Sequence, residues 1–525
     1  MNEELPDAGD ASIHSTCPEV KPWRPKRIIL ETDSPQPTRA GRVLNRVLSS
    51  GKLQVMHESF SSVAEKLSMN FNRLLQFSVV VILSIQTALA GDPRQPDIIF
   101  ILADDLGYAD TGVTGARGIG TPHIDRLAAE GISLTNAYSS SAICSPTRTA
   151  LLTGSYAQRF RLGLEEPLRS SDAKRHDLSI PENRNTIASV LRDQGYETAL
   201  VGKWHLGLPP EHGPLAHGYN DFFGIAQGAA DYFRHTMINN GKSSSNGLYQ
   251  GNEEVRRQGY LTDIFGDEAV RKIRSSGERP LFLSLHFTAP HWPWEGRGDF
   301  SVSDQLINTP HHDGGSLAVY REMVEVMDDN VGKVLAALEE SGRSDNAIVI
   351  FTSDNGGERF SDTWPFVGVK GELLEGGIRV PLFIRWPGKI KAGSSSGQVT
   401  ASMDFLPTLL AASGVSDTQS LYDGVNILPQ LLEHAEPVER TLFWRFKAGS
   451  QGAVRQGAWK YLKLGDKEHL FNLDADPRER VMLKDKFPDK FTELRTLYES
   501  WNREVLPYPA DSFSENVKNS YSDRY

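Results

Sequence analysis

The sequence has few cysteines for its length: only Cys17 and Cys144 in 525 residues. A fold held together by several disulfides is therefore excluded. Positive charge is also scarce, because 56 lysine and arginine residues stand against 67 acidic residues, which gives a net charge of −11. We therefore expect neither nucleic acid nor an anionic membrane as a partner, although a local group of basic residues can still bind a small anion.

Internal repeats and low-complexity tracts are absent, and the most apolar segment, residues 74–85, is too short for a membrane span. This segment follows Arg73 and precedes Ala88-Leu89-Ala90. A basic start, an apolar stretch and an A-x-A site are typical of a signal peptide, which we predict at residues 69–90. The alternative is a helix buried in the core. No stable membrane insertion is expected.

A signal peptide should open a chain, yet residues 1–68 precede this one. They are polar, contain several prolines and show no sustained periodicity. We expect them to be a spurious or disordered extension, with Met69 as the true start. The mature protein then begins near Gly91, is exported to the periplasm or the medium, and retains one cysteine. A lone thiol is unusual in an exported protein and indicates a reactive group.

From residue 97 onward, apolar runs typical of buried strands alternate with segments of helical periodicity. This alternation predicts an α/β fold, with a large, mostly parallel sheet flanked by helices in a catalytic domain at residues 91–430. The short "GSSSG" stretch is expected to be a surface loop. We expect strands at 97–103, within 196–207, at 280–287, at 347–353 and within 380–388, and helices at 121–131, 182–195 and 320–338.

The pattern changes near residue 431. Four short segments with strand character, "TLFWRF", "GAVRQG", "WKYLKL" and "HLFNL", follow one another at hairpin spacing. A helix is expected from Pro488 to Trp501, because proline is favoured at the first helical position. Residues 431–525 are therefore predicted to form a smaller α+β subdomain with an antiparallel sheet.

Two predicted strands end in pairs of polar residues. Asp104 and Asp105 follow the first strand, and Asp354 and Asn355 follow the strand at 347–353. Ligands bind beyond the carboxyl ends of parallel strands, and four side-chain oxygens suit a hard cation such as Ca²⁺ or Mg²⁺. Either pair alone could form an Asx turn or a helix cap. The two pairs together favour a metal site.

Cys144 precedes Ser145-Pro146, which is typical of the first turn of a helix. The thiol then lies at a helix N-terminus, where the helix dipole favours negative charge, with Arg148 one turn further on. Taken alone, a single cysteine is better explained as a small buried apolar residue. A redox role is disfavoured because no second cysteine is available to resolve a disulfide.

The segment "CSPTRTALLTG" resembles the C-x-P-x-R signature of the type I sulfatases, a branch of the alkaline phosphatase superfamily. The resemblance extends from about residue 97 into the C-terminal subdomain, and is nearest to the arylsulfatase A and N-acetylgalactosamine-6-sulfatase branch. Further segments similar to family blocks occur in family order: "ADDLGYAD", "GKWHLG", "TAPHWP", "SDNGG" and "GVKGELLEGGIRVP".

The resemblance implies hydrolysis of sulfate monoesters, with a sulfated sugar or polysaccharide as substrate and aryl sulfates as model substrates. In this family the cysteine is oxidised to Cα-formylglycine by a formylglycine-generating enzyme or an anaerobic sulfatase-maturating enzyme. The hydrated aldehyde attacks sulfur with one hydroxyl and forms a covalent sulfo-enzyme. Loss of the proton from the second hydroxyl then expels sulfate, so the covalent intermediate needs no attack by water.

The resemblance also implies the roles of individual residues. Asp104, Asp105, Asp354 and Asn355, together with residue 144, would bind one Ca²⁺, in preference to Mg²⁺. Arg148 would orient the diol, and Lys203 and His205 would contact diol and sulfate, with His205 as the base. His291 and Lys370 would bind sulfate and assist the leaving oxygen. Each of these last four side chains, taken alone, could instead be structural or solvated.

Other residues are weaker candidates. Trp292 and Trp294 either stack on the substrate or pack in the core, and His286 is expected to pack. Asp231, Tyr232, Arg234 and His235 are predicted to lie at the rim of a pocket, where one of them is a candidate for contact with the substrate, although the absence of such a contact is the favoured interpretation. Hydrolysis of phosphonate monoesters or phosphodiesters remains an alternative activity, because related enzymes share the nucleophile motif. A non-catalytic glycan-binding or metal-binding protein with a free thiol is a further alternative.

Overall fold

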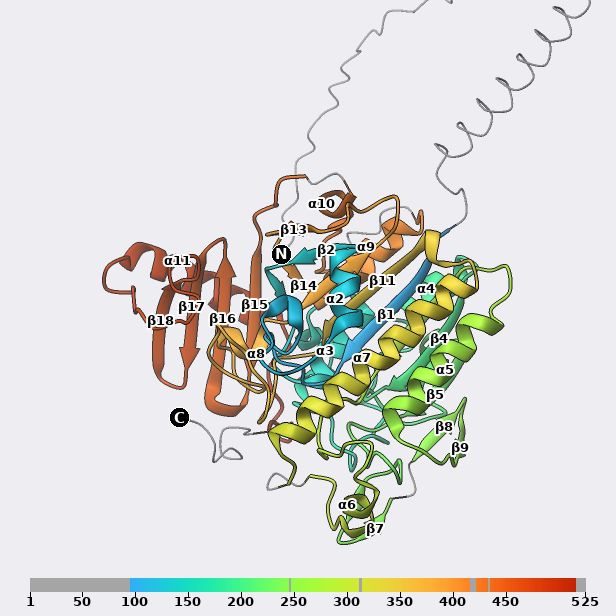
Figure 1. Cartoon of the computed structure of the whole chain (residues 1–525). Coiled ribbons are helices and arrows are strands. Elements are labelled where there is room, and N and C mark those ends of the chain that lie inside the picture. The colour runs from blue at the N-terminus through green and yellow to red at the C-terminus, as the bar shows by residue number, and fades with distance from the viewer. Residues whose placement is uncertain (1–94, 245–246, 311–313, 416–421, 433–434, 516–525) are drawn as a thin grey trace, which may run out of the picture. The chain divides into compact units, whose positions relative to one another are not determined.

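The computed structural model describes most of the chain after residue 94, and Figure 1 shows its arrangement. Within the described part, every helix is too short or too polar to cross a lipid bilayer. The predictions for residues 1–68 and 69–90, and Cys17, lie outside the described residues. Those residues are 95–515, except 245–246, 311–313, 416–421 and 433–434.

A ten-stranded mixed sheet runs through the unit formed by residues 90–525. Its strands, in order across the sheet, are β13 (Ser394–Ser396), β2 (Ile132–Leu134), β12 (Leu382–Arg385), β11 (Ala347–Ser353), β1 (Asp97–Ala103), β10 (Leu281–His286), β4 (Glu197–Lys203), β5 (Asp221–Ile225), β8 (Leu248–Gln250) and β9 (Glu253–Val255). The five strands from β11 to β5 are parallel, whereas β12, β8 and β9 are antiparallel to their inner neighbours. The predicted large, mostly parallel sheet is confirmed.

Helices cover both faces of this sheet. One face packs against α2 (Pro122–Ala129), α5 (Leu261–Ser275) and α7 (Leu317–Glu340), which lie on the same side in Figure 1. The other face packs against α3 (Cys144–Thr153), α4 (Ile187–Asp193), α9 (Phe405–Ala412) and α10 (Leu428–Leu432). Successive residues of β1 alternate between the two cores, which explains why the strand is apolar throughout.

Two local predictions differ in outcome. The stripe predicted on α7 is confirmed, because Met323, Met327, Val334 and Leu338 are fully buried on one face. The loop predicted at "GSSSG" is wrong, because Ser394–Ser396 pair in parallel with β2 as the edge strand β13. An edge strand with one exposed side needs no apolar residues, so hydrophobic periodicity could not detect it.

A four-stranded antiparallel sheet forms the C-terminal subdomain, as predicted. Its strands are β15 (Thr441–Phe446), β16 (Gln451–Gln456), β17 (Trp459–Leu464) and β18 (Lys467–Asn472), and α11 (Pro488–Glu504) packs against it. The apolar core of this sheet also contains Ile143 and Cys144 at the start of α3. The division of the chain at residue 430 stays a prediction.

The remaining short elements connect these layers. The two-residue strands β3 (Ala137–Tyr138) and β14 (Thr400–Ala401) pair in parallel, and β6 (Ile238–Asn239) and β7 (Lys242–Ser243) form a small antiparallel hairpin. The short helices are α6 (Phe300–Gln305) and α8 (Glu375–Ile378).

Candidate active site

The two predicted polar pairs meet at the carboxyl edge of the sheet. β1 and β11 are parallel neighbours in register from Asp97 opposite Ala347 to Ala103 opposite Ser353, so the residues that follow each strand emerge side by side. The amide of Asn355 donates a hydrogen bond of 2.7 Å to Asp105 Oδ1, and the backbone N–H of Asp105 donates one of 3.3 Å to Asp354 Oδ1. All four side chains, including that of Asp104, are buried.

Helix α3 brings Cys144 and Arg148 to the same edge. Cys144 is the first residue of the helix and lies with its Sγ 3.6 Å from Asp104 Oδ1. Arg148 donates to Asp354 Oδ2 from Nε (3.0 Å) and Nη2 (2.9 Å), and to the carbonyl oxygen of Lys203 (2.9 Å). Arg148 therefore ties α3 to the ends of β11 and β4, and so fixes the position of residue 144.

Two lysines face the aspartates. Lys203 Nζ lies 2.6 Å from Asp104 Oδ2, and Lys370 Nζ lies 2.7 Å from Asp105 Oδ2. With Arg148, three buried cations face the buried carboxyl groups of Asp104, Asp105 and Asp354, and Lys370 also lies 3.6 Å from Glu358 Oε2. Pairing with opposite charge offsets the large free-energy cost of burying each set alone.

The two predicted histidines donate to backbone carbonyls through different ring nitrogens. His291 Nδ1 lies 2.7 Å from the carbonyl oxygen of Trp292, so Nδ1 donates and Nε2, 3.5 Å from Asp105 Oδ2, faces the aspartate. His205 Nε2 lies 2.9 Å from the carbonyl oxygen of Leu168, so Nε2 donates. Among the described residues, His205 Nδ1 has no hydrogen-bond partner. A neutral His205 therefore presents Nδ1 as a free proton acceptor.

Burial sets the protonation of this site. Burial raises the pKa of Asp104 to about 8, although the charge of Lys203 opposes it. For Asp105, burial also acts to raise the pKa, but Lys370 and then Lys203 outweigh it and lower the pKa. Burial, and then the neighbouring lysine charges, lower the pKa of His205 and of His291 well below the usual value. Both imidazoles are therefore neutral near pH 7.

The donor set fits a metal ion. Ligand atoms of Asp104, Asp105, Cys144 and His291 all lie within 4.8 Å of one another. Among the described residues, Asn355 Oδ1 is buried without a hydrogen-bond donor, so it is available as an oxygen ligand. Carboxylate and amide oxygens favour a hard divalent cation. A metal can therefore bind here, and the geometry adds His291, which was not among the predicted ligands.

A cavity of about 210 Å³ opens onto this cluster and is lined by Cys144, His205, His291 and Lys370. The sequence did not identify other residues of this lining, which include Arg169, Ser170, Phe513 and Glu515. The C-terminal segment is held there by backbone hydrogen bonds from the N–H of Glu166 to the carbonyl of Phe513 (3.0 Å) and from the N–H of Glu515 to the carbonyl of Glu166 (2.7 Å). No motif marks this contact between segments far apart in the sequence.

The weaker candidates divide between the cavity and the core. Trp292 lines the cavity, whereas Trp294 is 2% exposed and packs edge-on against Phe360. His286 is buried beside Arg148, as expected, and burial and the Arg148 charge lower its pKa to about 3.

The segment expected to contact the substrate does not line the cavity with the residues singled out. Gly228, Ala229 and Met237 form the wall instead. The four predicted residues bind other protein groups; Tyr232, for example, donates a hydrogen bond of 2.9 Å to the carbonyl of His291. The remaining three are Asp231, Arg234 and His235, which bond Ser303 Oγ, the carbonyls of Ser303 and Leu306, and the carbonyl of Gly259.

The chain is similar in sequence to known proteins. Residues 96–415 match the sulfatase family model, and residues 370–497 match the C-terminal model of N-sulphoglucosamine sulphohydrolase. The N-acetylgalactosamine-6-sulfatase of Rattus norvegicus is 31% identical over 499 residues, covering 83% of this chain and 91% of the relative. Arylsulfatase J of Mus musculus is 29% identical over 480 residues, covering 79% and 77% respectively.

Solved structures give the same result. The crystal structure of Ps i-CgsB in complex with k-i-k-neocarrahexaose is 29% identical, with a TM-score of 0.71, and covers 81% of this chain and 96% of that one. The phosphonate monoester hydrolase of Agrobacterium radiobacter is 20% identical with a TM-score of 0.58, covering 78% and 96%. At that identity the second likeness shows the shared fold alone.

Proposed function

The chain belongs to the type I sulfatase family of the alkaline phosphatase superfamily and is a sulfuric ester hydrolase, and on this premise we propose that it releases sulfate from a sulfated sugar or polysaccharide with residue 144 as nucleophile. The observation that carries the proposal is the convergence of Cys144, Lys370 and two neutral histidines on one cavity, beside the pair of Lys203 and Asp104. Relatives named for sulfated sugars support the substrate class, and aryl sulfates would serve as model substrates.

We propose that Cys144 is matured to Cα-formylglycine by a formylglycine-generating enzyme or an anaerobic sulfatase-maturating enzyme. The hydrated aldehyde would offer one hydroxyl for attack on sulfur and a second for the expulsion of sulfate. The position of residue 144 at the start of α3, with its Sγ 3.6 Å from Asp104, supports this role. An unmodified thiol here would be a small buried apolar group that gains little from the charged side chains around it.

We propose that Asp104, Asp105, Asp354 and Asn355 hold one Ca²⁺ together with residue 144, with Mg²⁺ as the less favoured ion. The metal would supply a positive charge that lowers the pKa of a bound hydroxyl and offsets the charge of the sulfate. Arg148 already binds Asp354 and would keep both this carboxylate and residue 144 in place.

The cations and histidines would divide the remaining work. Lys203 and Lys370 would bind the sulfate oxygens and stabilise the negative charge that grows on them. His205 would take the proton of the second hydroxyl at Nδ1, because its Nε2 is held by the Leu168 carbonyl. His291 would bind the sulfate and assist the leaving oxygen from Nε2 only when that nitrogen carries a proton, because Nδ1 already donates to the Trp292 carbonyl.

Export is part of the proposal. The predicted signal peptide at residues 69–90 would direct the enzyme to the periplasm or the medium, where sulfated polysaccharides are available as substrates. N-terminal sequencing of protein from its own host would test it. A mature N-terminus before Met69 would refute both the predicted start and the signal peptide.

Peptide mass spectrometry over Ser141–Arg159 tests the nucleophile most directly. We expect an aldehyde at residue 144 in active enzyme, and folded but inactive protein in Cys144→Ala or after expression without a maturation system. Exhaustive chelation should abolish activity, and Ca²⁺ should restore it. Full sulfate release by protein that carries an alkylatable thiol at residue 144 would refute the proposed nucleophile. A greater kcat/KM for an aryl phosphodiester than for an aryl sulfate would favour the alternative activity.

A further inference from the structure

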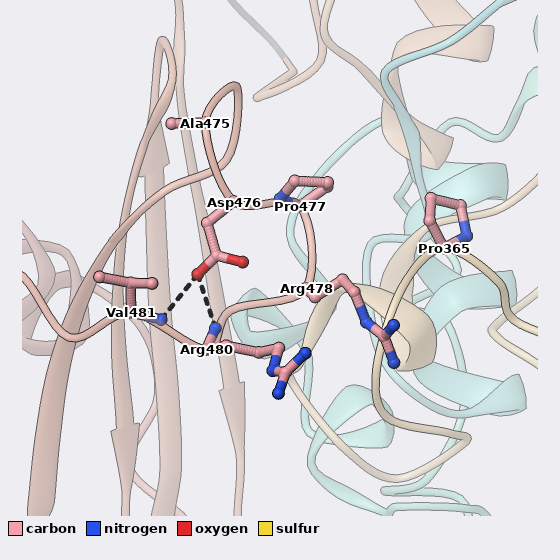
Figure 2. Close-up of a pocket in the computed structure, with 7 residues that line it drawn as sticks. All are labelled: Pro365, Ala475, Asp476, Pro477, Arg478, Arg480 and Val481. Atoms are coloured by element: carbon pink, nitrogen blue, oxygen red, sulfur yellow. Dashed lines mark hydrogen bonds between the residues drawn. The ribbon is translucent and has the colours of Figure 1, made fainter.

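Two further hollows lie outside the catalytic cavity, one lined by Trp364 and the other by the next residue, Pro365. One hollow of about 560 Å³ is lined by Pro365 and the loop of residues 475–481 (Figure 2). A second hollow of about 690 Å³ is lined by residues that include Arg117, Trp364 and Glu358. Trp364 is 47% exposed, although tryptophan is usually well covered, so its indole is accessible to a ligand.

Arginines surround this tryptophan. The guanidinium carbon of Arg478 lies 4.7 Å from the centroid of the Trp364 ring, and that of Arg117 lies 5.8 Å from it. Figure 2 shows Arg478 extending towards Pro365, with the side chain of Arg480 in the same hollow. Asp476, the one acidic residue of this hollow, is engaged by the backbone N–H groups of Arg480 and Val481.

These arginines lack the ion pairs that other surface arginines make. Among residues 95–515 outside the gaps, no carboxylate lies within ion-pair distance of the side chains of Arg117, Arg478 or Arg480. A comparable hollow on α5 also contains two arginines, but Arg271 pairs with Glu268 and Arg274 pairs with Glu340. In a chain of net charge −11, these unpaired arginines form a local anion-binding surface on the side of the Pro365 hollow, while the Trp364 hollow also contains Asp110, Glu358, Asp362 and Glu372.

We infer that this surface, defined as Arg117, Trp364, Arg478 and Arg480, binds a sulfated stretch of polysaccharide outside the catalytic cavity. Guanidinium groups donate paired hydrogen bonds to sulfate oxygens, and the apolar face of a sugar ring can pack on the indole. The Trp364 hollow also reaches Glu358, whose Oε2 lies 3.6 Å from Lys370 Nζ of the catalytic cavity. A polymer bound here therefore lies close to the wall of the active site.

The identity of the ligand rests on the proposed function, whereas the binding itself is tested separately. The experiment uses the full chain and measures affinity for immobilised dextran sulfate and for uncharged dextran in Arg478→Gln/Arg480→Gln. The matched control is Arg271→Gln/Arg274→Gln, which removes the same charge from the hollow on α5. Any dextran sulfate bound in the catalytic cavity contributes equally to both variants and cancels in the comparison.

We expect the affinity of Arg478→Gln/Arg480→Gln for dextran sulfate to fall roughly tenfold, equivalent to about 1.4 kcal/mol, while the control stays within twofold of the wild type. Trp364→Ala should weaken binding of dextran sulfate as well. The kcat/KM for 4-nitrophenyl sulfate should not change in any of these variants, because this substrate reaches only the catalytic cavity.

Equal affinities of the two double variants would overturn the inference. So would an equal loss of affinity for a single-stranded DNA dodecamer, which would show a surface for polyanions in general. The proposed function is tested independently by sulfate release from a panel of sulfated saccharides. Failure there would refute the saccharide substrate and leave the comparison of affinities intact.

Discussion

The buried ion pair of Glu375 and Lys460 joins the C-terminal sheet to the segment that follows Lys370. Substitution of Glu375 tests how much this pair contributes to the free energy of unfolding. Lys460 Nζ donates a hydrogen bond of 2.9 Å to Glu375 Oε1, while Arg379 and Tyr138 donate to Oε2 at 2.9 and 2.6 Å. Glu479 Oε1 also lies 2.9 Å from Lys460 Nζ, but without hydrogen-bond geometry. The two glutamates therefore share one lysine unequally.

Their pKa values differ accordingly. Burial acts to raise the pKa of Glu375, but Lys460, and then Arg379 and Arg455, outweigh it and lower the pKa from 4.5 to about 2. Burial, together with the charge of Glu375, raises the pKa of Glu479 to about 7. At about 1.4 kcal/mol per pH unit, ionised Glu375 stabilises the folded protein by about 3 kcal/mol at neutral pH, whereas ionised Glu479 does not stabilise it.

Glu375→Gln should therefore lower the free energy of unfolding by about 3 kcal/mol at pH 7, and Glu479→Gln, the control on the same lysine, by less than about 1 kcal/mol. With an unfolding entropy of roughly 0.9 kcal/mol/K for residues 90–525, the first variant should melt about 3–4 °C below the wild type in scanning calorimetry.

The effect has a defined dependence on pH. A lowered folded-state pKa stabilises above the unfolded value of 4.5, and this stability is lost as the pH falls towards about 2. The difference between wild type and Glu375→Gln should therefore shrink to about 1.4 kcal/mol at pH 3. A difference that is independent of pH, or equal losses in both variants, would refute the assignment of the charge to Glu375.

Two further predictions concern the active site. Gly202 has a φ of +114°, and a Cβ there would lie 1.8 Å from the carbonyl oxygen of His286, so Gly202→Ala should shift the end of β4 and cut aryl sulfatase activity by more than about 100-fold. Gly277→Ala is the control, because a Cβ there meets no atom within 4 Å, and equal activities of the two variants would refute the argument. Glu515 lines the catalytic cavity, so Glu515→Gln removes a charge of the same sign as the sulfates and should raise the ratio of kcat/KM for a disulfated saccharide to that for a monosulfated one by about fivefold. Asp511→Asn, at an exposed position of the same segment, should leave this ratio unchanged, and an unchanged ratio in Glu515→Gln would count against a role of Glu515 in specificity.

The core of the site could be predicted because its residues are tied to regular structure. Asp104 and Asp354 each follow a strand whose apolar run is visible in the sequence, and parallel neighbours end at the same edge. Cys144 and Arg148 are separated by one helical turn, so they remain on one side of α3. In each case the local pattern fixes the direction of the side chain.

The part of the cavity lining formed by the C-terminal segment could not be predicted, because it depends on contacts between distant segments. Phe513 and Glu515 reach the cavity through two backbone hydrogen bonds to Glu166, and backbone groups carry no sequence signal. The same reason applies to β13, whose serines pair with β2 through the backbone. The polar side chains singled out in residues 231–235 are not among those that line the cavity, because they bind other parts of the protein.

The composition of the sequence changes near residue 431, but the chemistry of the site does not stop there. Gln451, on β16, accepts a hydrogen bond of 3.0 Å from the N–H of Leu373 and donates one of 2.8 Å to the carbonyl of Gly371, on both sides of the turn that follows Lys370. The N–H of Gly371 also bonds the carbonyl of Ala142, two residues before Cys144. The C-terminal sheet therefore sets the position of Lys370 relative to the nucleophile, while the last described residues close the cavity. A catalytic part cut at residue 430 would keep every residue of the metal cluster and lose the parts that hold Lys370 in place, so the smaller subdomain is a working component of the active site.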